Sequence, residues 1–153
     1  MSDPKALSHL KQDPVLKKLI KQFRLRQSSS DPDIFVDLVD SVVSQQLSNK
    51  AAATIFARVE MQVGKMTPTN ILQTADQDLR NCGLSWAKVT YIKDLATKTK
   101  SGALQLNKLV DMADEEVVQH LIQVKGIGRW SAEMILMFSL NRPDVFPLGD
   151  VGI

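Results

Sequence analysis

With 153 residues, 44% of them hydrophobic, and a formal net charge of +2, the chain is long enough to bury a core and has the composition of a folded protein. No apolar run approaches the roughly 20 residues of a membrane-spanning helix, and the first residues lack the apolar stretch of a secretory signal. The single cysteine, Cys82, excludes an internal disulfide and any zinc or iron–sulfur site that needs several cysteines of this chain.

The first predicted elements are helices. The pair Asp13-Pro14 predicts a helix that continues through VLKKLIKQF, because aspartate caps a helix well and proline suits its first turn. The pair Asp31-Pro32 predicts the start of the next helix for the same reason. Its apolar residues recur at helical spacing and should face a core. They are Ile34, Phe35, Leu38, Val39, Val42 and Val43.

The middle of the chain continues the same pattern. Ser48 and Gly64 are expected to cap the two ends of a third helix. The segment 74–77, TADQ, fits a capping box in front of a short helix. Ser85 and Gly102 bound a longer one. No strand pattern competes with these signals.

The last part predicts two helices joined by a tight turn. A helix over 114–124 is followed by the turn 125–128 and by an apolar helix over 129–140. We find no internal repeat, low-complexity tract or linker between domains in the sequence. The expected architecture is therefore a single all-α domain over residues 1–153, with seven or eight short helices.

The turn at 125–128 contains two glycines, Gly126 and Gly128. A Gly-x-Gly turn permits positive φ and lets a ligand approach the backbone, and the next helix directs its free amides and its positive dipole end to the same place. These features predict an anion site suited to a DNA phosphate. The alternative is that the glycines only cap a helix, which is a common use of glycine.

The tail NRPDVFPLGDVGI is the second informative stretch. Pro143 and Pro147 stop a helix and predict an extended loop that ends in Asp150. A carboxylate on such a loop can be held in one position and act in catalysis. It could also serve only as a helix N-cap, and the two roles are compatible.

The segments VKGIGRWSAEMILMF and RPDVFPLGDVGI together resemble the helix-hairpin-helix DNA glycosylase superfamily, and most closely its 3-methyladenine DNA glycosylase II branch. Three further segments, SVVSQQLSNKAAATIF, GLSWAKVTYIKDLA and HLKQDPVLKKLI, extend the resemblance over nearly the whole chain in the same order. It implies the helix-hairpin-helix glycosylase fold. It also implies an N-glycosidic hydrolase of base excision repair that removes flipped-out alkylated purines such as 3-methyladenine.

The resemblance assigns a catalytic role to Asp150, which matches the carboxylate that stabilises positive charge on the sugar as the base leaves. Bifunctional members carry a nucleophilic lysine where this sequence has Trp130. Without that amine no Schiff base forms by this route, so we expect base release without lyase activity. Trp130 is expected instead to line the base pocket, with core packing as the alternative.

Further site residues follow from the resemblance. Trp86 could line the pocket or simply pack. Gln46 or Leu47 is expected to fill the gap that a flipped base leaves, and the alternative is a polar helix end with Leu47 packed inwards. The backbone amides near Gly126, Gly128 and Ser131 should bind the phosphate. The backbone carbonyls of Ile122, Val124 and Ile127 could hold Na⁺ or K⁺, and no other cofactor is required.

The expected partner is double-stranded DNA with a damaged base, bound by a monomer that does not associate with membranes. The protein should act in the bacterial cytoplasm, at the nucleoid, or in a nucleus. Family members continue beyond the catalytic carboxylate into a further helix, whereas this sequence ends at Ile153. The expectation is therefore a C-terminally incomplete fold. The alternative function is a catalytically incompetent helix-hairpin-helix module that binds DNA without hydrolysis.

Overall fold

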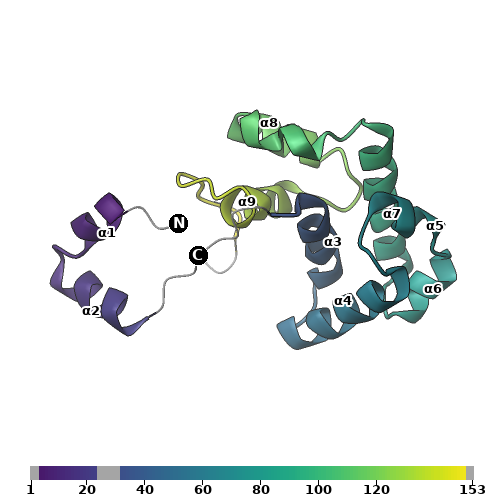
Figure 1. Cartoon of the computed structure of the whole chain (residues 1–153), viewed down its shortest axis with the longest axis horizontal. Coiled ribbons are helices and arrows are strands. Elements are labelled where there is room, and N and C mark those ends of the chain that lie inside the picture. Colours follow the sequence, from purple (N-terminus) through teal and green to yellow (C-terminus); the bar gives the residue numbers. More distant parts are fainter. Residues whose placement is uncertain (1–3, 24–31, 151–153) are drawn as a thin grey trace. The chain divides into compact units, whose positions relative to one another are not determined.

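The computed structural model describes residues 4–23 and 32–150. Within those ranges every regular element is a helix, so the predicted all-α class is confirmed (Figure 1). The chain divides into two compact units, Met1–Asp31 and Pro32–Ile153. That residues 1–153 form one domain stays a prediction. None of the described helices is both long and apolar enough to cross a membrane.

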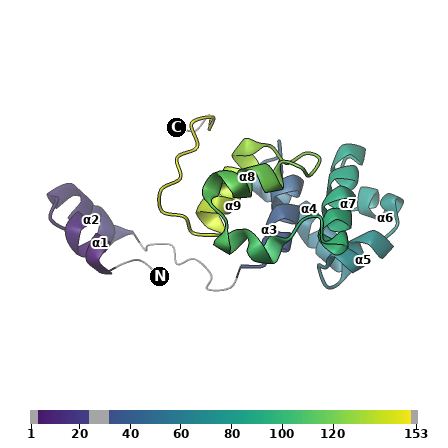
Figure 2. The same ribbon diagram turned by 90° about the horizontal axis from the view of Figure 1, so that it is seen from above.

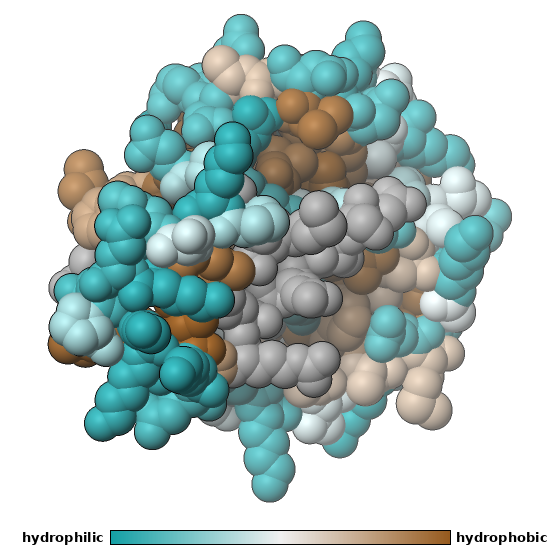
Figure 3. Space-filling view, turned by 60° about the vertical axis from the view of Figure 1, so that its left-hand side comes forward, coloured by the Kyte–Doolittle hydropathy of each residue, from teal (hydrophilic) through white to brown (hydrophobic). Residues whose placement is uncertain are grey.

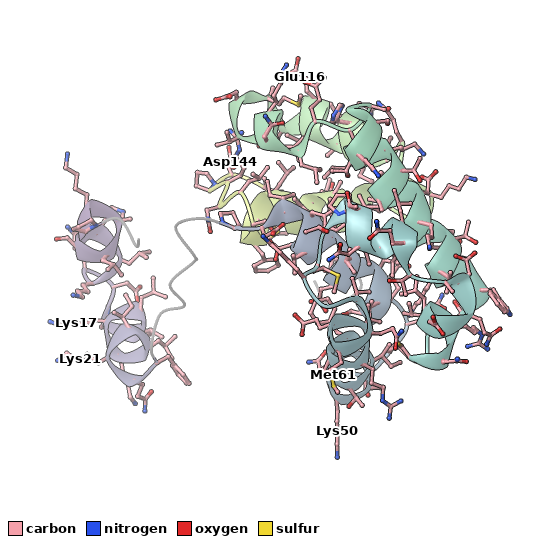
Figure 4. All side chains as sticks on the ribbon, turned by 45° about the vertical axis from the view of Figure 1, so that its right-hand side comes forward. Lys17, Lys21, Lys50, Met61, Glu116 and Asp144 are labelled. Atoms are coloured by element: carbon pink, nitrogen blue, oxygen red, sulfur yellow. The ribbon has the colours of Figure 1, made fainter. Side chains whose placement is uncertain are left out.

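The first unit contains α1 (Pro4–Leu10) and α2 (Pro14–Gln22). Asp13 caps α2 as predicted, because its carboxylate accepts hydrogen bonds from the first-turn amides at 2.8 and 2.9 Å. Neither helix buries a side chain within the described part of the unit. Lys17 and Lys21, one turn apart, project from the same side of α2 (Figure 4).

The second unit contains the remaining helices. They are α3 (Ile34–Ser44), α4 (Asn49–Val63), α5 (Pro68–Gln73), α6 (Asp76–Asn81), α7 (Trp86–Ser101), the 3₁₀-helix η1 (Leu106–Asp111), α8 (Asp114–Leu121) and α9 (Arg129–Phe138). Helix α7 packs against α5, α6 and α3, and α8 lies beside α9 (Figure 2). The short helices α5 and η1 were not predicted from the sequence.

Several predicted caps are confirmed and two are wrong. Ser48 and Ser85 accept amide hydrogen bonds at the starts of α4 and α7. Helix α3, however, is capped by Asp33, which accepts from the amide of Val36 at 3.2 Å. The predicted cap, Asp31, lies outside the described residues. Aspartate stands on both sides of Pro32, and the sequence pattern alone did not distinguish the two.

The capping box predicted at 74–77 is also wrong. Thr74 ends α5 instead of starting α6, and its hydroxyl donates back to the carbonyl of Asn70 at 2.9 Å. Helix α6 begins after Ala75 with no side-chain cap. A threonine hydroxyl can serve a preceding carbonyl as well as a following amide, and here the preceding helix takes it.

The core of the second unit lies between α3, α7, α8 and α9. The predicted inward face of α3 is confirmed, since Leu38, Val39, Val42 and Val43 are fully buried. Cys82 is buried as well, as one of the small side chains of this core. Burial raises the pKa of its thiol. Among the described residues drawn in Figure 3, hydrophobic side chains gather in separate patches between hydrophilic ones.

Candidate nucleic-acid interface and catalytic site

The turn between α8 and α9, residues Lys125–Gly128, is called the hairpin turn below. Its two glycines serve different purposes. Gly126 has a φ of +78°, and a Cβ there would overlap the ring of Tyr91 on α7. Gly128 has an extended φ of −96°, and a Cβ there would meet nothing within 4 Å. Only Gly126 therefore uses the left-handed region, whereas Gly128 leaves open space in front of the backbone.

Gly128 is also the N-cap of α9, and it has no side chain to bond the first-turn amides. The first amide of α9 bonded within the helix is that of Ala132, which donates to the carbonyl of Gly128 at 3.1 Å. The amides of Arg129, Trp130 and Ser131 precede it. They lie at the positive end of a ten-residue helix beside the open space at Gly128, an arrangement that favours an anion.

Arg129, the residue after Gly128, forms hydrogen-bonded ion pairs with two carboxylates. The Arg129 guanidinium donates to both oxygens of Glu115 on α8, at 2.7 and 3.1 Å, and to Glu133 one turn ahead at 3.2 Å. The hydrogen bonds from Arg129 lower the pKa of Glu115 to about 2. Arg129 therefore joins α8 to α9, and the first backbone amides of α9 are the groups at this helix end that could bind an anion.

Two side chains from elsewhere in the chain hold the hairpin turn. The amide of Lys125 donates to Asp94 of α7 at 2.9 Å. Burial of Asp94 opposes its ionisation, but hydrogen bonds from Lys98 and from that amide outweigh burial and lower its pKa. On the other side, the Nε2 amide of Gln45 donates to the carbonyl of Gly126 at 2.8 Å.

The predicted wedge residues lie on an exposed turn between α3 and α4. We call this turn, Ser44–Leu47, the wedge turn. The amide of Leu47 donates to the carbonyl of Ser44 at 3.2 Å, and Gln46 has a φ of +57°. This is the pattern of a type II turn, in which the third residue has positive φ. Gln46 is exposed and Leu47 is 38% exposed, so Leu47 is not packed into the core.

The catalytic candidate Asp150 lies at the end of a braced loop. The loop begins with Arg142, whose guanidinium donates to the carbonyls of Val110 and Met112, both at 2.8 Å. It ends in a turn closed by the amide of Asp150, which donates to the carbonyl of Pro147 at 2.9 Å. Hydrogen bonds at both ends therefore limit the loop's conformations, as the two prolines predicted.

The structure brings two predicted site residues together. The indole Nε1 of Trp130 donates to Oδ2 of Asp150 at 2.7 Å. Trp130 is 46% exposed and lies in the first turn of α9, beside the amides described above. A carboxylate, an exposed aromatic ring and the N-terminus of a helix therefore meet at one place. These groups suit a site that binds a phosphate and stabilises positive charge next to it.

Comparison with known proteins identifies the family. Residues 39–153 match the family described as HhH-GPD superfamily base excision DNA repair protein. The chain belongs to this superfamily. The solved structure of a Schizosaccharomyces pombe 3-methyladenine DNA glycosylase in complex with abasic DNA has 37% identity and a TM-score of 0.81, and the match covers 96% of this chain and 75% of that one. A Bacillus halodurans DNA-3-methyladenine glycosidase has 38% identity and a TM-score of 0.80, with 99% and 70% covered.

Sequence relatives of this HhH-GPD chain agree. It is 38% identical to DNA-3-methyladenine glycosylase 1 of Schizosaccharomyces pombe over 90% of the chain and 62% of that protein. It is 35% identical to the DNA-3-methyladenine glycosylase of Saccharomyces cerevisiae over 94% of the chain and 54% of that protein. The chain thus spans between half and two thirds of the length of these two relatives. The predicted fold and the predicted 3-methyladenine glycosylase branch are both confirmed.

Trp86, the other aromatic candidate of this HhH-GPD chain, has different neighbours. It is the first residue of α7 and is 55% exposed, so it is not a core residue. The guanidinium of Arg80 lies 6.0 Å from the centre of its ring, at the limit of a cation–π contact. Trp130 is hydrogen-bonded to Asp150, whereas Trp86 lies next to the guanidinium of Arg80. Its place in a base pocket stays a prediction.

The backbone around the hairpin turn is compatible with the expected monovalent cation. The carbonyl of Val124 accepts from the amide of Ile127 at 3.1 Å, and a carbonyl oxygen has a second lone pair for an ion. No group of three or more His, Cys, Asp or Glu side chains in the described residues could hold a metal. A cation here would therefore be bound by backbone oxygens, which suits Na⁺ or K⁺, and its presence stays a prediction.

Sequence reasoning missed the residues that support this site. Gln45, Tyr91 and Asp94 hold the hairpin turn, and Glu115 binds Arg129. The hydrogen bonds made by Gln45, Asp94 and Glu115 join residues that are 14 to 81 positions apart in the chain. No local pattern marks such pairs. Only Gln45 had a signal, its position beside the predicted wedge.

Proposed function

We propose that this protein is a monofunctional DNA glycosylase that hydrolyses the N-glycosidic bond of alkylated purines such as 3-methyladenine, flipped out of double-stranded DNA. The observation that carries the proposal is the hydrogen bond between Trp130 and Asp150 beside the amide end of α9. The relatives named above support it, because they are 3-methyladenine glycosylases by name.

The chemistry follows from charge. Cleavage of an N-glycosidic bond builds positive charge on the sugar ring as the base departs with the bonding electrons. A fixed carboxylate at Asp150 stabilises that charge more than it stabilises the substrate, in which the sugar is still uncharged, so it lowers the barrier. Water then adds to the sugar carbon that the base has left and gives up a proton to the solvent, which completes the hydrolysis. A base already made cationic by alkylation is a good leaving group and needs little acid catalysis.

Trp130 limits the reaction to hydrolysis. It stands where bifunctional family members carry their lysine, and an indole cannot form a Schiff base. The product is therefore an abasic site in an intact strand. The exposed indole can in addition stack on an electron-poor base, and Trp86 is the second candidate for that pocket.

The remaining groups bind the DNA. The amides near Gly126, Gly128 and Ser131 bind a backbone phosphate, with a Na⁺ or K⁺ ion held by the carbonyls of the predicted cation site. Gln46 or Leu47 on the wedge turn fills the space left by the flipped base. A monomer is sufficient for this arrangement, and it would act where genomic DNA lies, in the bacterial cytoplasm or in a nucleus.

The test is base release from methylated duplex DNA by the wild type, Asp150→Asn and Asp144→Asn. Asp144 is exposed on the same loop and serves as the matched control (Figure 4). We expect release by the wild type and by Asp144→Asn, and a loss of about 100-fold or more in Asp150→Asn. DNA binding without release by the wild type would instead favour the DNA-binding module. Strand cleavage trapped by borohydride would contradict the monofunctional assignment.

A further inference from the structure

The wedge turn and the hairpin turn are joined by one side chain. Nε2 of Gln45 donates to the carbonyl of Gly126 at 2.8 Å, across 81 residues of sequence. Gln45 is half-buried, and its hydrogen bond to Gly126 lies in an exposed part of the surface. It connects the exposed turn that carries Gln46 and Leu47 to the hairpin turn, next to which the first amides of α9 are proposed to bind a phosphate.

A third element, helix α7, holds the backbone of the same residue. The ammonium of Lys88 on α7 donates to the carbonyls of Val43 and Gln45, both at 2.7 Å. Burial lowers the pKa of Lys88. Helix α7 also packs Tyr91 against Gly126. The two turns are thus tied directly through Gln45 and indirectly through α7.

The backbone next to Gln45 is strained. Gln46 has a φ of +57°, in the left-handed region that a residue with a side chain rarely adopts. Strain of this kind persists only where neighbouring contacts hold the backbone in place. The hydrogen bonds on both sides of Gln45, at its side chain and at its carbonyl, are such contacts.

We infer that Gln45 is a positioning residue that sets the wedge turn in a defined place relative to the hairpin turn. The inference rests on the proposed function. The hairpin binds a phosphate and the wedge enters the base stack of the same duplex, so the DNA fixes the spacing that both must match. Two binding elements held at the correct spacing bind more tightly than two that must be ordered separately, with no new contact.

The consequence concerns lesion binding specifically. Undamaged duplex engages the hairpin but offers no gap for the wedge. A duplex with an abasic site engages the hairpin and also offers the wedge a gap. Loss of the Gln45 bond should therefore reduce the preference for abasic DNA over undamaged DNA, while a general weakening of the hairpin would reduce both affinities equally.

The experiment measures dissociation constants of the full chain for two duplexes, one undamaged and one with a tetrahydrofuran abasic analogue. The variants are Gln45→Met, which keeps length but cannot donate, and Gln45→Asn, which keeps the amide but is too short to reach. The matched control is Gln123→Met. Gln123 also donates to a backbone carbonyl, that of Gln119 at 3.3 Å, but this bond joins residues four positions apart and does not connect the two turns. Thermal melting checks that every variant folds.

We expect both Gln45 variants to lose about tenfold of the preference for abasic DNA, with undamaged-DNA affinity changed by less than about twofold. Gln123→Met should retain the wild-type preference. A wild-type preference kept in folded Gln45 variants would overturn the inference and leave the proposed function standing. An equal loss of both affinities would also overturn it. A wild type that shows no preference would overturn the proposed function, and the inference with it.

Discussion

The indole of Trp130 and the carboxylate of Asp150, 20 residues apart in the chain, are joined by a 2.7 Å hydrogen bond. The bond gives Trp130 a role besides its proposed place in the base pocket. Its N–H orients the carboxylate of Asp150, and its ring remains 46% exposed. A hydrogen bond to a charged acceptor is stronger than one between neutral groups, so this contact restrains Asp150 effectively.

The first prediction separates these tasks. Trp130→Phe keeps an aromatic ring but removes the N–H, so base release should fall by roughly 10- to 100-fold, the range expected for a hydrogen bond to a charged group. Single-turnover rates on methylated duplex measure it. Because the N–H acts through Asp150, the double variant with Asp150→Asn should be no slower than Asp150→Asn alone. A further slowing would show that the indole acts independently of the carboxylate.

The second prediction concerns Gly126. Alanine there would require a left-handed backbone at φ +78° and would overlap the ring of Tyr91. We expect Gly126→Ala to lower the free energy of unfolding by about 2–4 kcal/mol, from backbone strain and overpacking together. Chemical denaturation measures the change. An unfolding free energy close to that of the wild type would mean that neither constraint applies.

The third prediction concerns Gly128, where the opposite is expected. Its φ is extended and a Cβ would meet no protein atom, so Gly128→Val should fold with little change in melting temperature. The added side chain would project where a phosphate is expected, so duplex affinity should fall about tenfold or more. Fluorescence anisotropy with a labelled duplex measures it. Unchanged affinity would place the phosphate elsewhere.

The fourth prediction is a pH dependence of stability. The pKa of Glu115 is about 2 in the folded protein, against an ordinary value of 4.5, because Arg129 is bonded to it. A lowered pKa stabilises the fold above pH 4.5, and this contribution is lost as the pH falls from 4.5 towards 2. Wild type and Glu115→Gln should therefore differ in melting temperature at neutral pH and converge near pH 2. A difference that does not change with pH would rule out the ion pair as its source.

The sequence alone determined the fold class, the family and many helix boundaries. Caps such as Asp13, Ser48 and Ser85 act on amides two or three residues ahead, so the signal and its effect share one short segment. The errors were local as well. Asp33 caps α3 in place of Asp31, because two nearby aspartates could take the same role. Thr74 bonds to the helix before it, because its hydroxyl could serve either neighbouring helix.

Only the tertiary structure decided how the site is held together. Gly126 and Gly128 look equivalent in the sequence. In the structure, the ring of Tyr91 leaves no room for a Cβ at Gly126, whereas a Cβ at Gly128 would meet nothing within 4 Å. Trp130 and Asp150 were predicted separately, and folding joins them. The position of Gln45 beside the predicted wedge did not reveal its hydrogen bond to the hairpin turn, because that bond crosses 81 residues. A short sequence pattern predicts the conformation of its own segment of backbone, whereas contacts between side chains far apart in the sequence form only when the helices pack.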